Sequence, residues 1–196
     1  MNERKYVVQS ERLGFVMLIR EDILTMTAWF QNLEFGAYLR GAVSRPMTVE
    51  AETKWFEEHA APSESNLTFG ILELETQRLI GTCSLMDINS VNGIATLGIG
   101  IGETDCLGKG YGTEAVKLLV EYGMFFLNLH NIKLEVFGFN PRAIRAYEKA
   151  GFSLVGRRRA AYVLGGERYD DIIMDITRDE VDLSRMRGVM GLTDKN

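Results

Sequence analysis

The sequence predicts a single α+β domain, and two observations carry this prediction. Residues 67–74, 78–87 and 94–101 form three apolar runs joined by short turn-like segments, which indicates an antiparallel meander. Residues 113–129 then place apolar side chains at spacings of three and four, and a further strand is expected at 133–139. This βαβ unit adds a parallel pair with a right-handed crossover. We therefore expect a mixed, mostly antiparallel sheet of about seven strands flanked by helices.

The segments before the meander are less regular. Residues 11–20 predict a first strand, and residues 21–33 a helix whose first turn carries acidic side chains that suit the helix dipole. Residues 35–45 show no clear pattern. Pro46 and Thr48 then predict the start of a second helix at 49–60.

After the βαβ unit, Asn140 and Pro141 open a short helix that Gly151 closes. A final hairpin is expected from residues 152–158 and 169–176, with its turn near Gly165 and Gly166. The domain is expected to span residues 1–178, followed by a C-terminal tail, 179–196, that frays or lacks order.

Composition narrows the class of protein. The chain has 196 residues, 46% hydrophobic and 25% charged, which is typical of a globular domain. Its net charge of -5 argues against a nucleic-acid partner. The two cysteines form no CxxC pair, so no metal site or disulfide is expected. The sequence shows neither a signal-like apolar core nor an apolar run of the length a membrane span needs, so a cytoplasmic protein without a membrane partner is expected.

The glycine-rich stretch Gly108-Lys109-Gly110-Tyr111-Gly112-Thr113 separates the strand at 94–101 from the helix at 113–129. A helix N-terminus offers unpaired N–H groups and positive potential, and glycines let a diphosphate approach the backbone. The spacing fits neither a Walker loop nor a dinucleotide fingerprint. A plain turn explains three alternate glycines as well, so the loop alone does not decide between the two interpretations.

A second motif, which follows the glycine-rich stretch along the chain, decides between the two interpretations. The sequence of residues 108–115, GKGYGTEA, followed by residues 140–152, NPRAIRAYEKAGF, resembles the GNAT superfamily of acetyl-CoA-dependent N-acetyltransferases. Within it, the chain looks most like the branch of the ribosomal-protein N-terminal acetyltransferases. The resemblance implies the GNAT fold, with a sheet that splays between its two central strands.

The resemblance also implies a binding site for acetyl-CoA as cosubstrate. The pantetheine arm would pair with the strand edge at Ile99, Gly100 and Ile101. The diphosphate would bind backbone N–H groups of the loop, whose seven residues are Leu107, Gly108, Lys109, Gly110, Tyr111, Gly112 and Thr113. The family's usual Gln or Arg is replaced here by Leu107, which removes any polar side-chain role at that position.

On the second motif, Tyr147 matches the residue that protonates the departing CoA thiolate in many family members. Its spacing also suits a core tyrosine. Asn140 would lie beside the pantetheine and thioester, and it is equally a helix N-cap. Arg142 is a further cofactor contact or part of a solvated face, and Thr113 is a candidate N-cap for its helix.

The general base is the weakest part of the inference. Many relatives carry Glu where this chain has Thr96, which cannot accept a proton. Glu103, Asp105 and Asp87 are substitutes, and a chain of waters is another.

The function expected is transfer of an acetyl group from acetyl-CoA to a primary amine by direct attack, through a tetrahedral intermediate. The acceptor would be a small molecule (an amino sugar, a polyamine or an aminoglycoside-like compound) or a peptide N-terminus. The resemblance also allows a homodimer. The alternative is a CoA-binding or sensing module of weak activity, which the missing strand Glu motivates. A nucleotide-phosphate binder of unrelated chemistry lacks a recognisable ribose or magnesium ligand.

Overall fold

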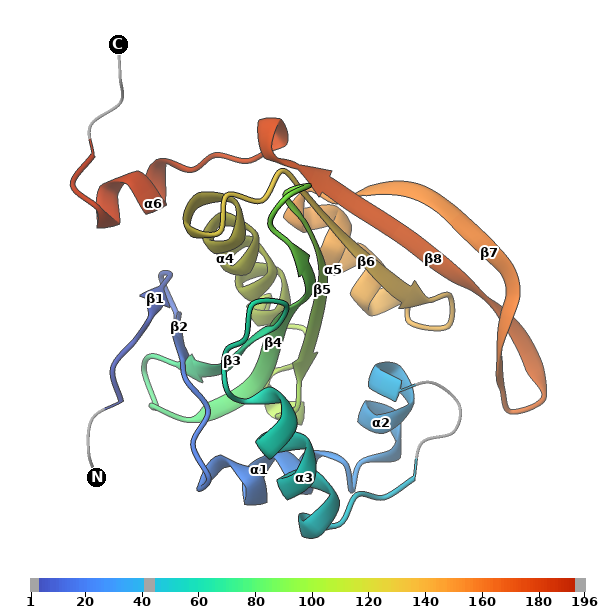
Figure 1. Ribbon diagram of the computed structural model, residues 1–196. Coiled ribbons are helices and arrows are strands. Elements are labelled where there is room, and N and C mark those ends of the chain that lie inside the picture. The colour runs from blue at the N-terminus through green and yellow to red at the C-terminus, as the bar shows by residue number, and fades with distance from the viewer. Residues whose placement is uncertain (1–3, 41–44, 193–196) are drawn as a thin grey trace.

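One twisted sheet organises the protein (Figure 1). The computed structural model describes residues 4–40 and 45–192. Its sheet has eight strands in the order β1-β2-β3-β4-β5-β6-β8-β7, and only β5 and β6 run parallel. The mixed, mostly antiparallel sheet is therefore confirmed, with eight strands where about seven were expected. The strands expected at 67–74, 78–87, 94–101 and 133–139 are present with similar bounds. The strands are β1 Val8–Gln9, β2 Leu13–Val16, β3 Leu67–Glu73, β4 Leu79–Asn89, β5 Ile94–Ile101, β6 Asn131–Phe137, β7 Ser153–Leu164 and β8 Glu167–Thr177.

The first strands differ from the expectation. The single strand predicted at residues 11–20 is shorter, and β1 precedes it. Val8 and Gln9 pair with Phe15 and Gly14, and two residues are too few to give a readable alternation.

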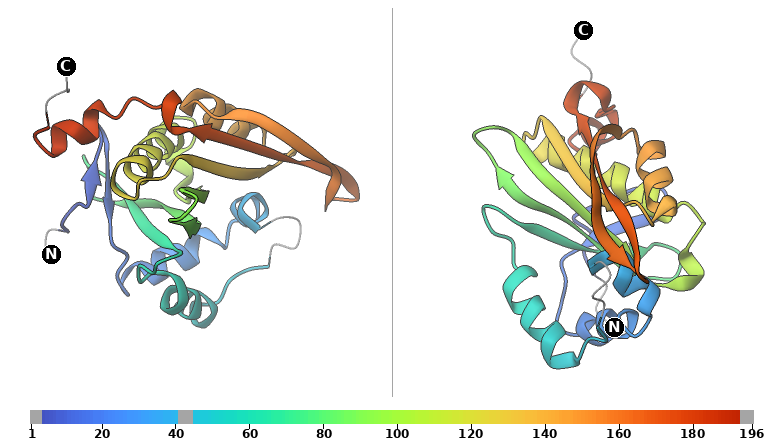
Figure 2. Two further views of the ribbon diagram at one scale, coloured as in Figure 1. Left: turned by 45° about the horizontal axis from the view of Figure 1, so that its top comes forward. Right: turned by 90° about the vertical axis from the view of Figure 1, so that its right-hand side faces the viewer.

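The central helix α4 (Tyr111–Phe126) covers one face of the sheet, and α5 (Pro141–Ala150) lies beside it (Figure 2, left). The apolar face of α4 packs against the inward side chains of β5 and β6, and its residues Leu118, Leu119 and Met124 are completely buried. This core fixes the strand, loop and helix on which the glycine-rich stretch lies.

Three helices lie on the other side of the sheet (Figure 2). They are α1 (Asp22–Trp29), α2 (Leu33–Arg40) and α3 (Val49–His59). A helix is present within the range expected at 21–33, but it ends at Trp29. The Asn32 side chain accepts hydrogen bonds from the N–H groups of Glu34 and Phe35, where a second helix begins. The segment 35–45 therefore starts within α2, and residues 41–44 lie outside the described residues.

The chain after β8 also has structure. A short 3-10 turn at Arg178–Glu180 leads to α6 (Ser184–Val189), whose Met186 is fully buried in the main core. Arg185 of α6 forms an ion pair with Glu121 of α4 at 3.2 Å. The expected tail thus includes a helix docked on α4, and the proposed boundary at residue 178 stays a prediction. Among the described residues, no helix is long and apolar enough to cross a membrane.

Candidate active site

The sheet opens between β5 and β6. These strands pair only through Ile94 to Thr96 of β5 and Asn131 to Lys133 of β6, yet β5 continues to Ile101. Past Thr96, β5 keeps its ladder with β4 but has no strand partner on the β6 side among the described residues. The expected splay is therefore present, and Ile99, Gly100 and Ile101 lie on an edge that can bind an extended chain through main-chain hydrogen bonds.

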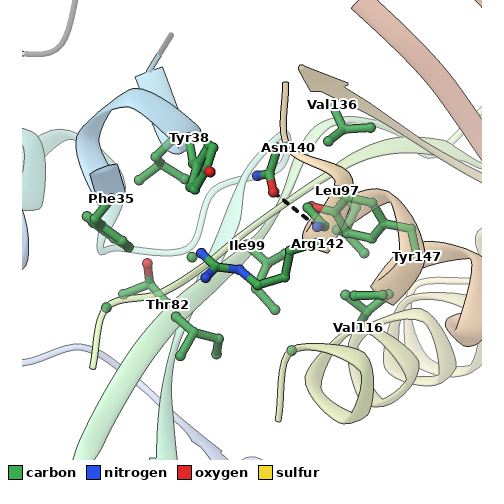
Figure 3. Close-up of a pocket in the computed structure, with 18 of the residues that line it drawn as sticks. Phe35, Tyr38, Thr82, Leu97, Ile99, Val116, Val136, Asn140, Arg142 and Tyr147 are labelled. Atoms are coloured by element: carbon green, nitrogen blue, oxygen red, sulfur yellow. Dashed lines mark hydrogen bonds between the residues drawn. The ribbon is translucent and has the colours of Figure 1, made fainter. Parts of the chain in front are cut away.

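A cavity of about 900 Å³ occupies this opening. Figure 3 shows Phe35 and Tyr38 of α2 on one side and Val116 and Tyr147 on the other. Strands β4, β5, β6, β7 and β8 also contribute lining side chains. This volume lies in the range of cofactor and small-molecule sites. The two ends of the cavity differ in chemistry.

Close packing against β5 explains why glycines occur within this strand. A Cβ on Gly100 would come within 3.2 Å of the Phe35 ring, and one on Gly98 within 3.0 Å of the Met86 methyl group. Side chains of α2 and β4 therefore pack closely against the glycine backbone of β5.

The glycine-rich loop is a helix N-terminus, as predicted. Gly108 and Gly110 have φ angles of +75° and +86°, which L side chains rarely adopt, and α4 begins at Tyr111. Of the seven residues expected to bind the diphosphate, six line the cavity, and Lys109 does not. The backbone geometry suits an anion, while Lys109 contributes charge from outside the cavity wall.

The expected N-cap role of Thr113 is wrong. Gly110 occupies that position, and the Thr113 hydroxyl donates instead to the carbonyl oxygen of Ala146 at 3.3 Å. Because the helix starts two residues earlier than expected, Thr113 lies within its first turn and links α4 to α5.

A polar network that sequence reasoning missed holds the loop from behind. Arg12 donates to the Lys109 carbonyl oxygen at 3.1 Å, pairs with Glu114 at 2.6 Å, and lies over the Tyr111 ring. Burial favours protonation of Glu114, but hydrogen bonds from Ser10 and Arg12 outweigh it and lower the pKa of this carboxyl group. The Arg12–Glu114 pair spans 102 residues, so no local pattern reveals it.

The hydroxyl of Tyr111 continues this network. It donates to the Glu73 carboxylate, which also accepts from Thr76 at 2.6 Å. The hydrogen bond to Glu73 raises the pKa of Tyr111 to about 12. The first residue of α4 is therefore anchored to the end of β3.

Helix α5 carries the second motif as expected. The Asn140 side chain accepts from the Ala143 N–H at 3.1 Å, and Gly151 adopts the left-handed conformation at the other end (Figure 3). The cap uses the side-chain oxygen of Asn140, so its NH₂ group is available to the cavity that it lines. Asn140 is therefore the expected N-cap, and its contact with the pantetheine and thioester stays a prediction.

Tyr147 extends from α5 into the cavity and is 8% exposed. Burial raises its pKa to about 12, because the phenolate would lose its hydration. The hydroxyl therefore stays protonated at neutral pH and can donate a proton to a departing thiolate.

Positive charge gathers at the α5 end of the cavity. Arg142, Arg145 and Lys149 all line it. Arg142 also pairs with Glu34 of α2 at 3.7 Å and lies over the Tyr38 ring. These contacts join α5 to α2 near the opening and place cations where an anionic cosubstrate would enter.

Among the candidate bases, only Asp87 lines the cavity. Glu103 accepts from the Trp29 indole at 2.8 Å, and both Glu103 and Asp105 pair with Arg78. The hydrogen bond from Arg78 lowers the pKa of Asp105. Glu103 and Asp105 are thus explained as structural carboxylates.

Two carboxylates on the open face of the sheet, Glu135 and Asp171, were not predicted as site residues. Glu135 of β6 and Asp171 of β8 line the cavity, as does Asp87 of β4. Glu135 alternates with buried Leu134 and Val136, and this polar alternation was the available signal. Lys133 of β6 also lines the cavity and pairs with Glu135 at 3.2 Å, so this face carries three carboxylates and one cation, whereas α5 contributes cations.

A splayed sheet, a helix N-terminal anion cradle and a buried tyrosine are the features that the resemblance implied for an acetyl-CoA-dependent acyltransferase. A family model described as "Acetyltransferase (GNAT) domain" matches residues 12–153. The chain therefore belongs to the GNAT acetyltransferase family. The expected class of enzyme, an acetyl-CoA-dependent N-acetyltransferase, is confirmed at this level.

Relatives agree with this assignment. The probable N-acetyltransferase YjcK of Bacillus subtilis is 35% identical over 132 residues, which cover 66% of this chain and 72% of the relative. The spermidine N(1)-acetyltransferase of Vibrio cholerae is 32% identical over 102 residues, 52% of this chain and 58% of that protein. The match to the uncharacterized N-acetyltransferase p20 of Bacillus licheniformis, 32% identical over 57% of this chain, spans 62% of that relative's length.

Solved structures share the fold. Spermidine N-acetyltransferase from Vibrio cholerae, in complex with CoA and spermine, superposes with a TM-score of 0.76 at 24% identity, covering 87% of this chain and 98% of that one. A GNAT-family acetyltransferase from Bacillus anthracis gives 0.76 at 18% identity, covering 88% and 99%. The GNAT fold is therefore confirmed.

Proposed function

We propose that this protein acetylates a primary amine of a small polycation of the polyamine class, with acetyl-CoA as donor. The observation that carries the proposal is the separation of charge within one cavity. Cations of α5 lie at one end, whereas the open face of three strands contributes Asp87, Glu135 and Asp171 together with one cation, Lys133, which pairs with Glu135. An anionic cosubstrate and a cationic acceptor would each meet the opposite charge.

In the proposed reaction, the acceptor amine attacks the thioester carbonyl, and a backbone N–H on the free edge of β5 stabilises the oxyanion. The C–S bond then breaks, and Tyr147 protonates the leaving thiolate. The amine proton passes to water or to a carboxylate lining the cavity, for which Asp87 is the candidate. The acceptor must attack as the neutral amine. The products are the acetylated amine and CoA.

The relatives support this acceptor class, because several are named spermidine N-acetyltransferases. A peptide N-terminus, as the ribosomal-protein branch would use, is the competing acceptor. A cytoplasmic location and a homodimer remain part of the proposal. The location is the expectation drawn from the sequence pattern, and the homodimer is what the resemblance to the GNAT superfamily allows.

The test is turnover with a panel of amines at fixed acetyl-CoA, read out as thiol release. Spermidine, an amino sugar, an aminoglycoside and a peptide with a free N-terminus represent the candidate classes, and mass spectrometry of the product identifies the acetylated nitrogen. We expect kcat/KM for spermidine to exceed the others by about tenfold or more, because each favourable charge contact in a partly desolvated site adds affinity. Preference for the peptide would overturn the polyamine assignment.

Thr96 favours one alternative, a CoA-binding module of weak activity, because it cannot serve as a base. Thermal stabilisation by acetyl-CoA without thiol release for any amine in the panel would support this alternative.

A further inference from the structure

Asp171 is a buried carboxylate with an unused oxygen. It lies on β8, in register with Phe137 of β6 and with Arg158 of β7. The residue is 2% exposed, and within the described part of the chain its Oδ1 has no hydrogen-bond partner. Asp171 also lines the cavity. A buried carboxylate oxygen without a partner costs free energy, so its retention here points to a ligand.

The protein compensates this charge only in part. Arg158 approaches the other oxygen, Oδ2, at 3.3 Å, but the Arg158 side chain is 64% exposed, so solvent screens the pair. Burial, and then the nearby charge of Glu135, raise the pKa of Asp171 above its ordinary value, while the charges of Arg158 and Lys133 oppose the shift. A cation held at Oδ1 would remove this imbalance.

Aromatic rings border the same place. Tyr162 of β7 packs edge-on against Phe137, with ring centroids 4.5 Å apart, and Tyr162 lines the cavity with Asp171. A bulge in β7 between Arg158 and Tyr162 bends this strand, so that the Tyr162 ring of β7 and the Asp171 carboxylate of β8 both line the cavity. Rings beside a carboxylate suit an alkylammonium, whose methylenes pack on the rings while its charge meets the acid.

We propose that Asp171 is the specificity-determining residue of the acceptor site, where it binds a second ammonium group of a diamine or polyamine while the first amine reaches the thioester. Tyr162 and Phe137 contact the intervening methylenes. This inference rests on the proposed function and names the feature of the acceptor that the site selects: two amino groups on one aliphatic chain.

The register of the sheet supports this placement. Asp171 lies directly across from Phe137, and adjacent strands are about 4.8 Å apart. Asn140 follows Phe137 by three residues and begins the helix that carries Tyr147. The carboxylate therefore lies one strand to the side of the segment that leads from β6 to Asn140 and Tyr147.

The experiment compares two acceptors of equal carbon number, butylamine and diaminobutane, in the parent protein and in Asp171→Asn. Asn keeps the shape of the side chain and removes its charge. We expect KM for diaminobutane to rise about tenfold or more with kcat nearly unchanged, since one charge-assisted hydrogen bond is lost. KM for butylamine and the affinity for acetyl-CoA should stay within about twofold. Glu167→Gln, at the exposed turn end of the same hairpin, removes the same charge outside the cavity and should change neither acceptor.

Two outcomes would overturn the inference. If Asp171→Asn weakened both acceptors equally, its role would be structural, and if it changed neither, the second ammonium would bind elsewhere. Either result leaves the proposed function intact, provided that the parent protein acetylates diaminobutane or spermidine. Failure of the parent protein with every polyamine would instead refute the proposed function itself.

Discussion

The hydroxyl of Tyr111, at the first position of α4, donates a hydrogen bond to the carboxylate of Glu73, at the last position of β3. This hydrogen bond fixes the start of α4, which forms the anion cradle, to the end of a strand of the sheet. The ring of Tyr111 in turn lies under the Arg12 guanidinium, which holds the loop carbonyl of Lys109. The shape of the cradle thus depends on residues that contact no diphosphate themselves.

Tyr111→Phe is expected to lower the free energy of unfolding by about 1–3 kcal/mol, because the buried Glu73 carboxylate loses one donor. The affinity for acetyl-CoA should fall as well, since the start of α4 loses its anchor. Urea unfolding and CoA titration measure the two effects. Tyr6→Phe removes the exposed hydrogen bond to Gln77 and is the matched control, expected to change stability by less than about 1 kcal/mol. Equal effects for both variants would contradict the anchoring role.

Gly110→Ala is expected to raise the Kd for acetyl-CoA about tenfold or more. The left-handed backbone at this position costs a non-glycine residue about 1–2 kcal/mol, and relief of that strain distorts the cradle. Gly188→Ala in α6 is the control, because a Cβ there meets open space and its φ is ordinary. A Gly110→Ala protein that bound acetyl-CoA like the parent would show that the loop conformation is not required.

Tyr147→Phe is expected to reduce kcat about 10²-fold or more while the Kd for acetyl-CoA stays nearly unchanged, because only the proton donor is lost. Since the pKa of Tyr147 is about 12, the parent enzyme should show no loss of this proton donor across neutral pH. Single-turnover rates and their pH profile measure this. Tyr122→Phe, a tyrosine of α4 outside the cavity, is the control. A kcat equal to that of the parent protein would exclude Tyr147 as the acid.

Asp171→Asn is expected to change stability in a pH-dependent way. The pKa of Asp171 is raised in the folded state, so the folded protein holds this proton more tightly than the unfolded chain. The contribution of Asp171 to stability is therefore full below its unfolded pKa and falls as pH rises through the folded pKa. Relative to the parent, the variant should gain free energy of unfolding between acid and neutral pH. Urea unfolding at several pH values measures this difference, and a constant difference would mean that the Asp171 pKa is not raised.

The sequence predicted those parts of the fold that depend on local patterns. The β5 strand, the α4 helix and the Asn140–Gly151 helix with both its caps are read from residues that are close in the chain. The break at Asn32 was missed because a side-chain cap within an apolar run does not interrupt the periodicity.

The candidate site was most predictable where its residues belong to a motif. Leu107 to Thr113 and Tyr147 are of this kind, and the cavity contains all of them except Lys109. Arg12 and Asp171 act through partners from distant segments or other strands, and their importance comes from burial and pairing that exist only in the folded chain. The position of the Thr113 side chain likewise depends on α5.

The short parallel contact between β5 and β6 gives the molecule a mechanical property. Three residue pairs, Ile94 to Thr96 with Asn131 to Lys133, are the direct strand link between the meander and the C-terminal part of the sheet. We expect a link this short to act as a hinge, so that small rotations about it change the width of the opening at Tyr147 while the ladders on either side stay intact. An extended ligand bonded along β5 would brace this hinge. We therefore expect substrate loading to stiffen the whole sheet, with product release as the moment when its two parts regain their relative motion.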